Sequence, residues 1–218
     1  MAGRAVRVGV LALQGAFREH CSVLEAVGVD ALEIRRPDQL ADIDGLVIPG
    51  GESTTIRLLM ADFGLVPFLH DRLADGLPVL GTCAGLIVLA RTVDDAPGQG
   101  LDALNVSVRR NAFGRQVDSF EEDLVVPALG AAPFHGVFIR APLVESVGPD
   151  VQVLAELAGE RIVAVRQNSI VGLAFHPELT PDHRFHQFFV DIVRQHVRAR
   201  TQAPYVVAEV GARAGPGD

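Results

Sequence analysis

The sequence predicts an α/β protein: a three-layer, open sheet with a mainly parallel core and helices on both faces. In the N-terminal part of the chain, short apolar runs alternate with segments of helical length, which is the pattern of repeated strand–helix units. A sheet built from such units is parallel and is covered on both faces. Further along, strand-like segments are joined by turn-rich connections. Mixed or antiparallel strands are therefore expected to extend the parallel core.

The N-terminal part of the chain provides the parallel strands and the helices between them. We expect strands at residues 6–13, 31–34, 45–48 and 77–80, and helices at 17–27, 56–60 and 86–90. In the first helix, Cys21 follows Phe17 by four residues and precedes Leu24 by three. Residues at this spacing share one face of a helix, so Cys21 is expected to line the buried face.

The C-terminal part combines further strands with a last helix. The strand-like segments are 105–109, 116–118, 136–139, 151–156, 161–166 and 170–175. Thr180 is expected to cap the last helix, with Pro181 at its first position. The apolar stripe of that helix consists of Phe185, Phe188, Phe189, Ile192, Val193, His196 and Val197. His183 and His186 could contact one metal ion, but exposed histidines at a helix start are the interpretation we favour.

Length and composition favour one domain followed by a tail. A chain of 218 residues with 49% hydrophobic content can bury a full core. We expect residues 1–200 to form this single domain. Residues 201–218 are rich in Ala, Gly and Pro, which is typical of a flexible C-terminal tail.

Charge and hydropathy argue against several classes of partner. A net charge of −8 argues against a general binder of nucleic acid or of anionic membranes. No apolar run has transmembrane length, and no charged-then-apolar signal opens the chain. Two cysteines without such a signal suggest a reducing cytosol and not a disulfide framework. We therefore expect a cytoplasmic protein, and no motif calls for a cofactor or a metal.

Residues 81–85, with the sequence Gly-Thr-Cys-Ala-Gly, lie between two apolar runs. They predict a strand, a tight turn and a helix with Cys83 at the apex, the arrangement of a nucleophile elbow. Glycines on both sides allow the sharp turn and a close approach of strand and helix. At a helix N-terminus, unpaired N–H groups and the helix dipole favour a thiolate. Cys83 is therefore a candidate nucleophile, although cysteine is also often buried as a small hydrophobic residue.

A candidate base follows the strand expected at 170–175. In an extended chain residues i and i+2 point the same way, so His176 and Glu178 would share one face. Pro177 between them fixes its own φ and keeps the preceding residue extended. A carboxylate beside an imidazole orients the ring and stabilises its protonated form. A surface turn is the alternative, but elbow and pair both follow strands, where α/β sheets place their sites. This favours a Cys-His-Glu triad.

An oxyanion hole needs backbone N–H groups in fixed positions. The elbow offers the N–H of Ala84, the residue after the nucleophile. Gly50 and Gly51, which follow the third expected strand, can offer a second from Gly51 because glycine permits conformations that other residues forbid. Ser53 or Thr54 could also cap the helix that follows, and both roles are compatible. A phosphate loop is disfavoured because the G-K-[ST] ending is absent.

Three motifs together resemble class I glutamine amidotransferases, which have a flavodoxin-like α/β fold. They are, in order, Pro49-Gly50-Gly51, the Gly-x-Cys-x-Gly elbow and His176-Pro177-Glu178. Five further segments narrow the resemblance to the family of glutaminase subunits of pyridoxal 5′-phosphate synthase. These segments are 11–20, 50–55, 110–116, 138–142 and 176–180. The similarity extends from about residue 6 to about residue 197 and leaves out the tail.

The resemblance implies an enzyme that hydrolyses L-glutamine to L-glutamate and ammonia. The ammonia would pass to a (β/α)8-barrel synthase that makes pyridoxal 5′-phosphate (vitamin B6), in a large hetero-oligomer with one glutaminase per synthase chain. It implies Cys83 as the nucleophile and His176 and Glu178 as its charge partners. The residues that match glutamine-binding positions are Gly51, Glu52, Ser53, Arg110, Ile139 and Arg140.

Two other classes of function stay open on the sequence alone. One is a stand-alone cysteine hydrolase with the same elbow, such as a peptidase or a glyoxalase-like protein. It would not need Arg110 and Arg140 to clamp an α-amino acid, and it would act without a partner. The other is a non-catalytic binding subunit, which would have no chemical need for all three triad groups.

Overall fold

The centre of the molecule is a parallel sheet of five neighbouring strands. The computed structural model describes residues 5–97, 100–112 and 119–202. The five strands are, in order across the sheet, β2 (Asp30–Ile34), β1 (Arg7–Leu11), β3 (Gly45–Ile48), β4 (Val79–Thr82) and β13 (Ile170–Leu173). Each neighbouring pair is parallel, and every residue of β3 and β4 is buried. All five strands were predicted. For β1 and β13, the predicted strands are slightly longer than the observed ones.

Six further strands extend this core into an 11-stranded sheet within the described residues. They are β12 (Arg161–Gln167), β11 (Gln152–Leu157), β10 (Leu143–Val147), β7 (Leu104–Arg109), β5 (Ala90–Val93) and β6 (Ala96–Pro97). Strand β12 is antiparallel to β13, β11 and β10, and β10 is antiparallel to β7, whereas β5 runs parallel to β7. The predicted α/β fold with a parallel core and mixed additions is confirmed.

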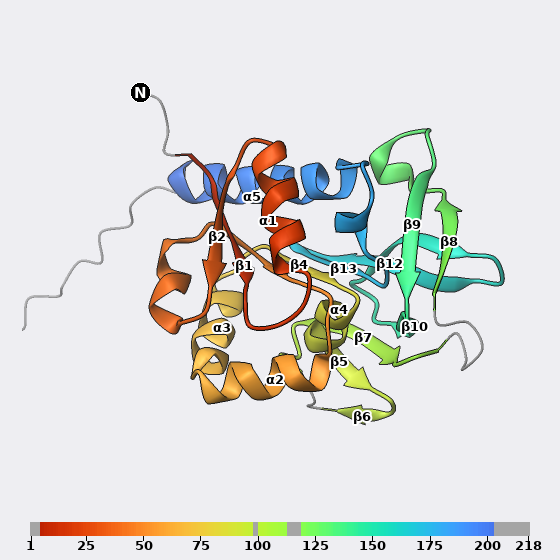
Figure 1. Cartoon of the computed structure of the whole chain (residues 1–218), viewed down its shortest axis with the longest axis horizontal. Helices are drawn as coiled ribbons and strands as arrows, with labels where there is room; N and C mark the ends of the chain where they lie inside the picture. The colour runs from red at the N-terminus through yellow and green to blue at the C-terminus, as the bar shows by residue number, and fades with distance from the viewer. Residues whose placement is uncertain (1–4, 98–99, 113–118, 203–218) are drawn as a thin grey trace, which may run out of the picture.

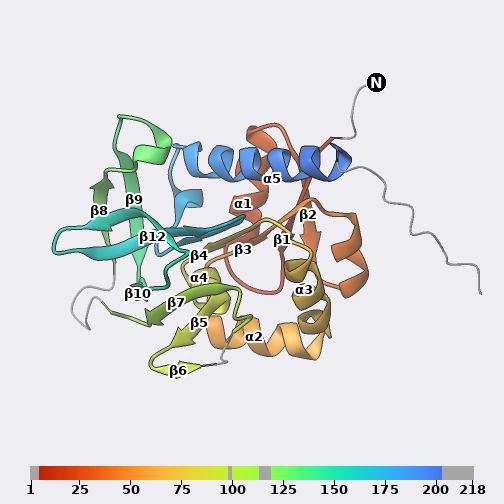
Figure 2. The same cartoon turned by 180° about the vertical axis from the view of Figure 1, so that it is seen from behind.

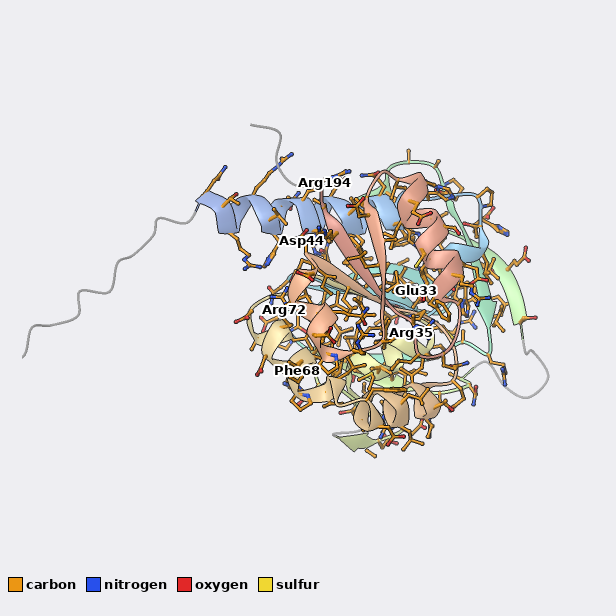
Figure 3. All side chains as sticks on the ribbon, turned by 60° about the vertical axis from the view of Figure 1, so that its left-hand side comes forward. Glu33, Arg35, Asp44, Phe68, Arg72 and Arg194 are labelled. Carbon is orange, nitrogen blue, oxygen red and sulfur yellow. The ribbon has the colours of Figure 1, made fainter. Side chains whose placement is uncertain are left out.

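Helices cover both faces of the sheet. Figures 1 and 2 show α1 (Phe17–Ala26) and α5 (Arg184–Gln202) on one face. On the other face lie α2 (Ser53–Asp62), α3 (Leu65–Ala74) and α4 (Ala84–Leu89). In α3, the Arg72 side chain donates a hydrogen bond of 2.9 Å to the carbonyl of Ile43, which ties this helix to the start of β3 (Figure 3).

A separate two-stranded antiparallel sheet is formed by β8 (Ser119–Leu124) and β9 (Phe134–Ile139). It is fastened to the main body by aromatic packing. Phe134 of β9 meets Phe175 and Phe185 with ring centroids 5.7 and 4.8 Å apart, and all three side chains are fully buried. This packing fixes the N-terminal end of β9, and Phe138, whose ring centroid lies 5.4 Å from that of Phe175, holds the strand beside Ile139.

Several elements differ from the prediction. The predicted strand at 116–118 lies outside the described residues. The sequence reading missed α3, β5, β6, β8 and β10. Strand β8 has the sequence Ser-Phe-Glu-Glu-Asp-Leu and is largely exposed. It lacks the apolar run from which the other strands were predicted. Thr201 and Gln202, which were expected in the tail, belong to α5. Residues 203–218 lie outside the described residues.

The prediction that Thr180 caps the last helix is wrong. The chain first makes the 3₁₀ turn η3 (Pro177–Leu179), and α5 begins only at Arg184. The Thr180 hydroxyl donates to the carbonyl of Pro177 and accepts the backbone N–H of Asp182, both at 3.3 Å. The carboxylate of Asp182 accepts the N–H of Arg184 at 3.0 Å. Thr180 therefore shapes the turn between η3 and α5.

One prediction about a buried helix face is wrong, and another is met in part. His186 was expected to be exposed, but it is fully buried because it lies on the inner face of α5 with Phe185 and Phe189. Cys21 packs against the core but stays half-buried, and the position beside it, His20, is the one that is fully buried. Burial, with nearby carboxylates, raises the pKa of the Cys21 thiol to about 11. It is therefore a poor nucleophile at neutral pH.

We predict that Phe134→Ala lowers the free energy of unfolding by about 3–5 kcal/mol, because it leaves a cavity among buried aromatic rings. Urea denaturation of the purified protein measures this. Phe68→Ala is the matched control, since Phe68 is 51% exposed (Figure 3), and its effect should stay within about 0.5 kcal/mol. Equal losses in the two variants would contradict an anchoring role for Phe134.

Candidate active site

Cys83 lies at a sharp turn between β4 and α4. Its backbone has φ 49° and ψ −102°, a strained conformation for a residue with a side chain, as expected at a nucleophile elbow. The N–H of Cys83 donates to the carbonyl of Leu173 at 2.8 Å, which joins the elbow to the end of β13. A side chain on Gly81 would lie 2.7 Å from the backbone of Gly85, so both glycines are needed for this packing. The predicted strand–turn–helix is confirmed.

His176 and Glu178 form a buried pair. His176 Nδ1 lies 2.7 Å from Glu178 Oε1, and the two residues are 7% and 6% exposed. The expected extended geometry is wrong, because Pro177 opens the η3 turn and the carboxylate folds back towards the ring. The backbone N–H of His176 donates to the carbonyl of Val137 in β9 at 2.9 Å. The position of the ring thus depends on both β13 and β9.

Neighbouring groups determine the charge of this pair. Burial lowers the pKa of His176, but hydrogen bonds to Cys83 and Glu178 outweigh it and raise the pKa to about 10. Burial also raises the pKa of Glu178, but the facing imidazoles of His20 and His176 bring it below its ordinary value. The resting pair is therefore an imidazolium beside a carboxylate, which is the form that stabilises a neighbouring thiolate.

The predicted site residues come together around one cavity of about 380 Å³. Every predicted catalytic, oxyanion and glutamine-binding residue lines this cavity except Glu178, which bonds to His176. The lining residues that were predicted are Cys83, His176, Gly51, Ala84, Glu52, Ser53, Arg110, Ile139 and Arg140. Sequence reasoning did not name three further lining residues, which are Gln14, Ile87 and Asn111. Gln14 and Asn111 belong to segments that carried the family resemblance, so position in those segments was the available signal.

The loop after β3 is held from two sides. The N–H of Gly50 donates to the Thr82 hydroxyl at 3.1 Å, and its carbonyl accepts the N–H of Ala16 at 3.0 Å. Because a trans peptide points its C=O and N–H in opposite directions, the Gly51 N–H points away from Ala16. A side chain on Gly50 would collide with the ring of His176. The loop can therefore pack on His176 only with glycine at this position.

Glu52 caps α2, so the prediction that Ser53 or Thr54 does so is wrong. Its carboxylate accepts the N–H groups of Thr54 and Thr55 at 3.1 and 2.7 Å, because the longer side chain reaches both. The hydrogen bond from the Thr55 hydroxyl, followed by those from the backbone, lowers the pKa of Glu52 to about 2. The N–H of Glu52 donates to the Gln14 side chain at 2.8 Å. Glu52 is thus an ionised group at the cavity.

The two arginines differ in how they are held. Arg110 donates through its side chain to Asp94 at 2.6 Å and through its backbone N–H to the same carboxylate at 2.9 Å. The backbone hydrogen bond is the main reason that the pKa of Asp94 is lowered. Arg140 directly follows β9 and has φ 44°, a conformation that sets the direction in which its side chain leaves the chain. Both line the cavity.

Among the described residues, no group of three or more His, Cys, Asp and Glu side chains is arranged to hold a metal ion. None of the helices described is long and apolar enough to span a bilayer.

Comparison with known proteins places the chain in a family. The model of the SNO glutamine amidotransferase family matches residues 10–195. The chain belongs to this family. It is 58% identical over 200 residues to "Pyridoxal 5'-phosphate synthase subunit PdxT" of Leifsonia xyli, covering 91% of this chain and 100% of the relative. The protein of the same name from Carboxydothermus hydrogenoformans is 52% identical, over 86% of this chain and 98% of its own length.

A solved structure agrees with this assignment. A protein described as glutamine amidotransferase superposes with a TM-score of 0.81 at 48% identity, over 86% of this chain and 98% of that one. The predicted membership of the glutamine amidotransferases, and of the branch that includes PdxT, is confirmed.

The raised pKa of His176 predicts that its contribution to stability depends on pH. A histidine whose pKa is higher in the folded than in the unfolded protein stabilises the folded state. This stabilisation is complete below the pKa of the unfolded state, near 6.5, and is lost as the pH rises through the folded-state pKa of about 10. The gap in unfolding free energy between the unmodified protein and His176→Asn should therefore shrink from pH 6 to pH 10. Urea denaturation across this range measures it, with His70→Asn on the exposed face of α3 as control. A constant gap would contradict the charged pair.

Proposed function

We propose that the chain is the glutaminase subunit of pyridoxal 5′-phosphate synthase, with Cys83, His176 and Glu178 as its catalytic triad. It hydrolyses L-glutamine to L-glutamate and ammonia and delivers the ammonia to a synthase partner. The observation that carries the proposal is that the elbow thiol of Cys83 and the ring of His176 line one cavity, while His176 holds a buried carboxylate at 2.7 Å. Membership of the glutamine amidotransferases and relatives named as PdxT support the substrate and the pathway.

The chemistry follows from the charges of the triad. The Cys83 thiolate attacks the amide carbon, and the carbonyl electron pair moves onto the oxygen. His176 gives its proton to the leaving nitrogen, ammonia departs, and a thioester to glutamate is left. Water then attacks the thioester with His176 as base, which releases glutamate and regenerates the thiol. Glu178 keeps the ring oriented and stabilises its charged form.

The oxyanion hole is assigned to Gly51 and Ala84. Ala84 is the first residue of α4, so its N–H has no partner within the helix. Gly51 lines the same cavity, and its N–H points away from Ala16. Together these two donors would bind the negative oxygen of the tetrahedral intermediate.

The remaining lining residues are assigned to the amino-acid end of glutamine. Arg110 and Arg140 offer guanidinium groups that suit an α-carboxylate. Glu52 offers an ionised carboxylate to the α-ammonium group, while Ser53 and Ile139 complete the wall. A cavity of about 380 Å³ is at the small end of ligand pockets, which suits one free amino acid.

We further propose that the partner is the (β/α)8-barrel synthase subunit, in a large hetero-oligomer with one glutaminase per synthase chain in the cytoplasm. The names of the relatives, which describe them as synthase subunits, support a partner. The net charge of −8 argues against nucleic acid or an anionic membrane in that role.

A synthase that contacts the start of α1 could control the oxyanion hole. Ala16 holds the carbonyl of Gly50, and Gln14 holds the N–H of Glu52, so residues 14–16 bracket the Gly50–Gly51 peptide. A glycine peptide can rotate with little steric cost, and only one orientation presents an N–H to the oxyanion. Contacts at residues 14–16 would bias this orientation.

We predict that Cys83→Ala abolishes glutamine hydrolysis and that a change at His176 is nearly as severe, because triad members act as a unit. Glu178→Gln should also damage turnover, since it removes the charge that stabilises the imidazolium. Glutamate release by the assembled synthase complex measures these effects. Synthesis of pyridoxal 5′-phosphate from added ammonium should survive in each variant and serves as the control for assembly. Comparable turnover in Cys83→Ala would refute the triad.

We predict that Arg110→Ala or Arg140→Ala mainly raises the KM for glutamine, because contacts far from the amide bind ground and transition states alike. Each lost charge-assisted contact should cost about 1.5–3 kcal/mol, or roughly a 10- to 150-fold higher KM. Steady-state kinetics of the complex gives KM and kcat separately. Arg91→Ala, whose side chain pairs with Asp102 outside the cavity lining, is the control. An unchanged KM would remove that arginine from the glutamine site.

We predict that the isolated chain is a poor glutaminase that its synthase activates. Titration of a matched barrel synthase, followed by glutamate release, should show strong activation that saturates near one synthase chain per glutaminase. Full activity of the isolated chain, unchanged by the synthase, would instead favour a stand-alone hydrolase.

A further inference from the structure

Two fully buried histidines lie behind the catalytic carboxylate, and the triad chemistry uses neither. His20 comes from α1 and His186 from α5, 166 residues apart in sequence. His20 Nδ1 and His186 Nε2 are 2.9 Å apart, and both side chains have no exposed surface. Two polar rings in a hydrophobic core are costly unless their hydrogen bonds are made, so this contact calls for an explanation.

The other nitrogen of His20 faces the active site. His20 Nε2 lies 3.4 Å from Glu178 Oε2, the carboxylate oxygen that does not bond to His176. The same nitrogen lies 3.1 Å from the hydroxyl of Thr82. That hydroxyl accepts the N–H of Gly50, in the loop that carries the oxyanion residue Gly51. One ring nitrogen therefore touches both the acid–base pair and the support of the oxyanion loop.

The chemistry of the neighbours fixes where the protons lie. An ionised carboxylate can only accept, so a favourable contact with Glu178 requires the hydrogen of neutral His20 on Nε2. Nδ1 of His20 then accepts from His186 Nε2–H. This leaves His186 Nδ1 as a bare lone pair. His186 Nδ1 and Glu178 Oε2 are two of the three buried side-chain atoms without a hydrogen-bond partner in the described part of the chain, so the 3.4 Å contact of His20 with the carboxylate is electrostatic and not a hydrogen bond. An unpaired acceptor costs less than an unpaired donor, which agrees with this arrangement.

We propose that His20 is a positioning residue of the glutaminase, which holds Glu178 and the Thr82–Gly50 contact in one geometry through its Nε2–H. His186 orients His20 from behind. The inference rests on the proposed triad. Loss of His20 would remove the N–H group that faces the buried Glu178 Oε2 at 3.4 Å, so the carboxylate would become easier to protonate and less able to orient His176. Neutral His20 supplies only a donor, and burial lowers its pKa, which keeps it neutral.

The test compares His20→Leu with His20→Gln in the complete synthase complex. Gln carries an N–H donor at a reach close to that of Nε2, whereas Leu carries none. His20→Leu should lower kcat about 10- to 100-fold with little change in KM, as is typical when an outer-shell partner is removed. His20→Gln should recover most of this loss. Cys83→Ala in the same assay tests the triad separately, and ammonium-driven synthesis of pyridoxal 5′-phosphate controls for assembly.

The pH profile separates positioning from mere packing. The titratable groups facing His20 are Glu178 and His176 from the η3 region and His186 from α5, with Glu19 on its own helix. Losing the donor raises the pKa of Glu178, so the acid limb of kcat/KM should move to higher pH in His20→Leu and return in His20→Gln. An unmoved limb, or Gln no better than Leu in kcat, would overturn the proposal even if Cys83→Ala is inactive.

A second variant keeps the proposal testable if His20→Leu does not fold. Thr82→Val has nearly the same shape but removes the hydroxyl that receives the Gly50 N–H. It should lower kcat and leave the acid limb in place, since the contact between His20 and Glu178 remains. Wild-type kcat in Thr82→Val would show that this contact does not support the oxyanion loop and would overturn that part of the proposal.

Discussion

The hydrogen bond between His176 and Glu178 is the interaction on which the rest of the site depends. A buried carboxylate is stable only if nearby groups compensate its charge, and here the imidazole of His176 does so at 2.7 Å. The bond forms across the η3 turn, so it needs the end of β13 and the contact of His176 with β9 to stay in place. The aromatic packing around Phe134 therefore stabilises not only the small sheet but also the position of the catalytic ring.

Close backbone approach is the second constraint, and it explains where glycine is required. The elbow of Cys83 can pack closely because Gly81 lets β4 approach α4 and Gly85 lets α4 approach Ile48 of β3. Gly50 lies against the ring of His176, where any side chain would collide. The loop, the elbow and the histidine thus meet at van der Waals distance, and the cavity beside them is small. These contacts hold Cys83, His176 and the Gly50–Gly51 loop together at one side of the cavity.

Local patterns in the sequence located most residues of the candidate site, whereas features that depend on long-range packing were missed. Cys83 and the His176–Glu178 pair could be found because each lies in a short motif directly after an apolar strand. The role of Glu52 as helix cap could not, since it depends on side-chain reach and not on the usual preference for Ser or Thr. His186 was misjudged for a similar reason. Its burial follows from the inner face of α5 and from His20, which is 166 residues away and invisible to any local pattern.

Helix α1 connects the two halves of the active site. Its first turn is preceded by Ala16, which holds the carbonyl of Gly50, while His20, one turn later, lies against Glu178 and Thr82. Thr82 accepts the N–H of Gly50. The carbonyl of Gly50 is therefore bonded to Ala16 directly before α1, and its N–H is connected to His20 of α1 through Thr82. A small shift of this helix would alter the oxyanion loop and the carboxylate together. Because Gln14, which lies just before α1, lines the cavity, a partner bound at this segment would act on the Gly50–Gly51 loop and on Glu178 through one rigid element.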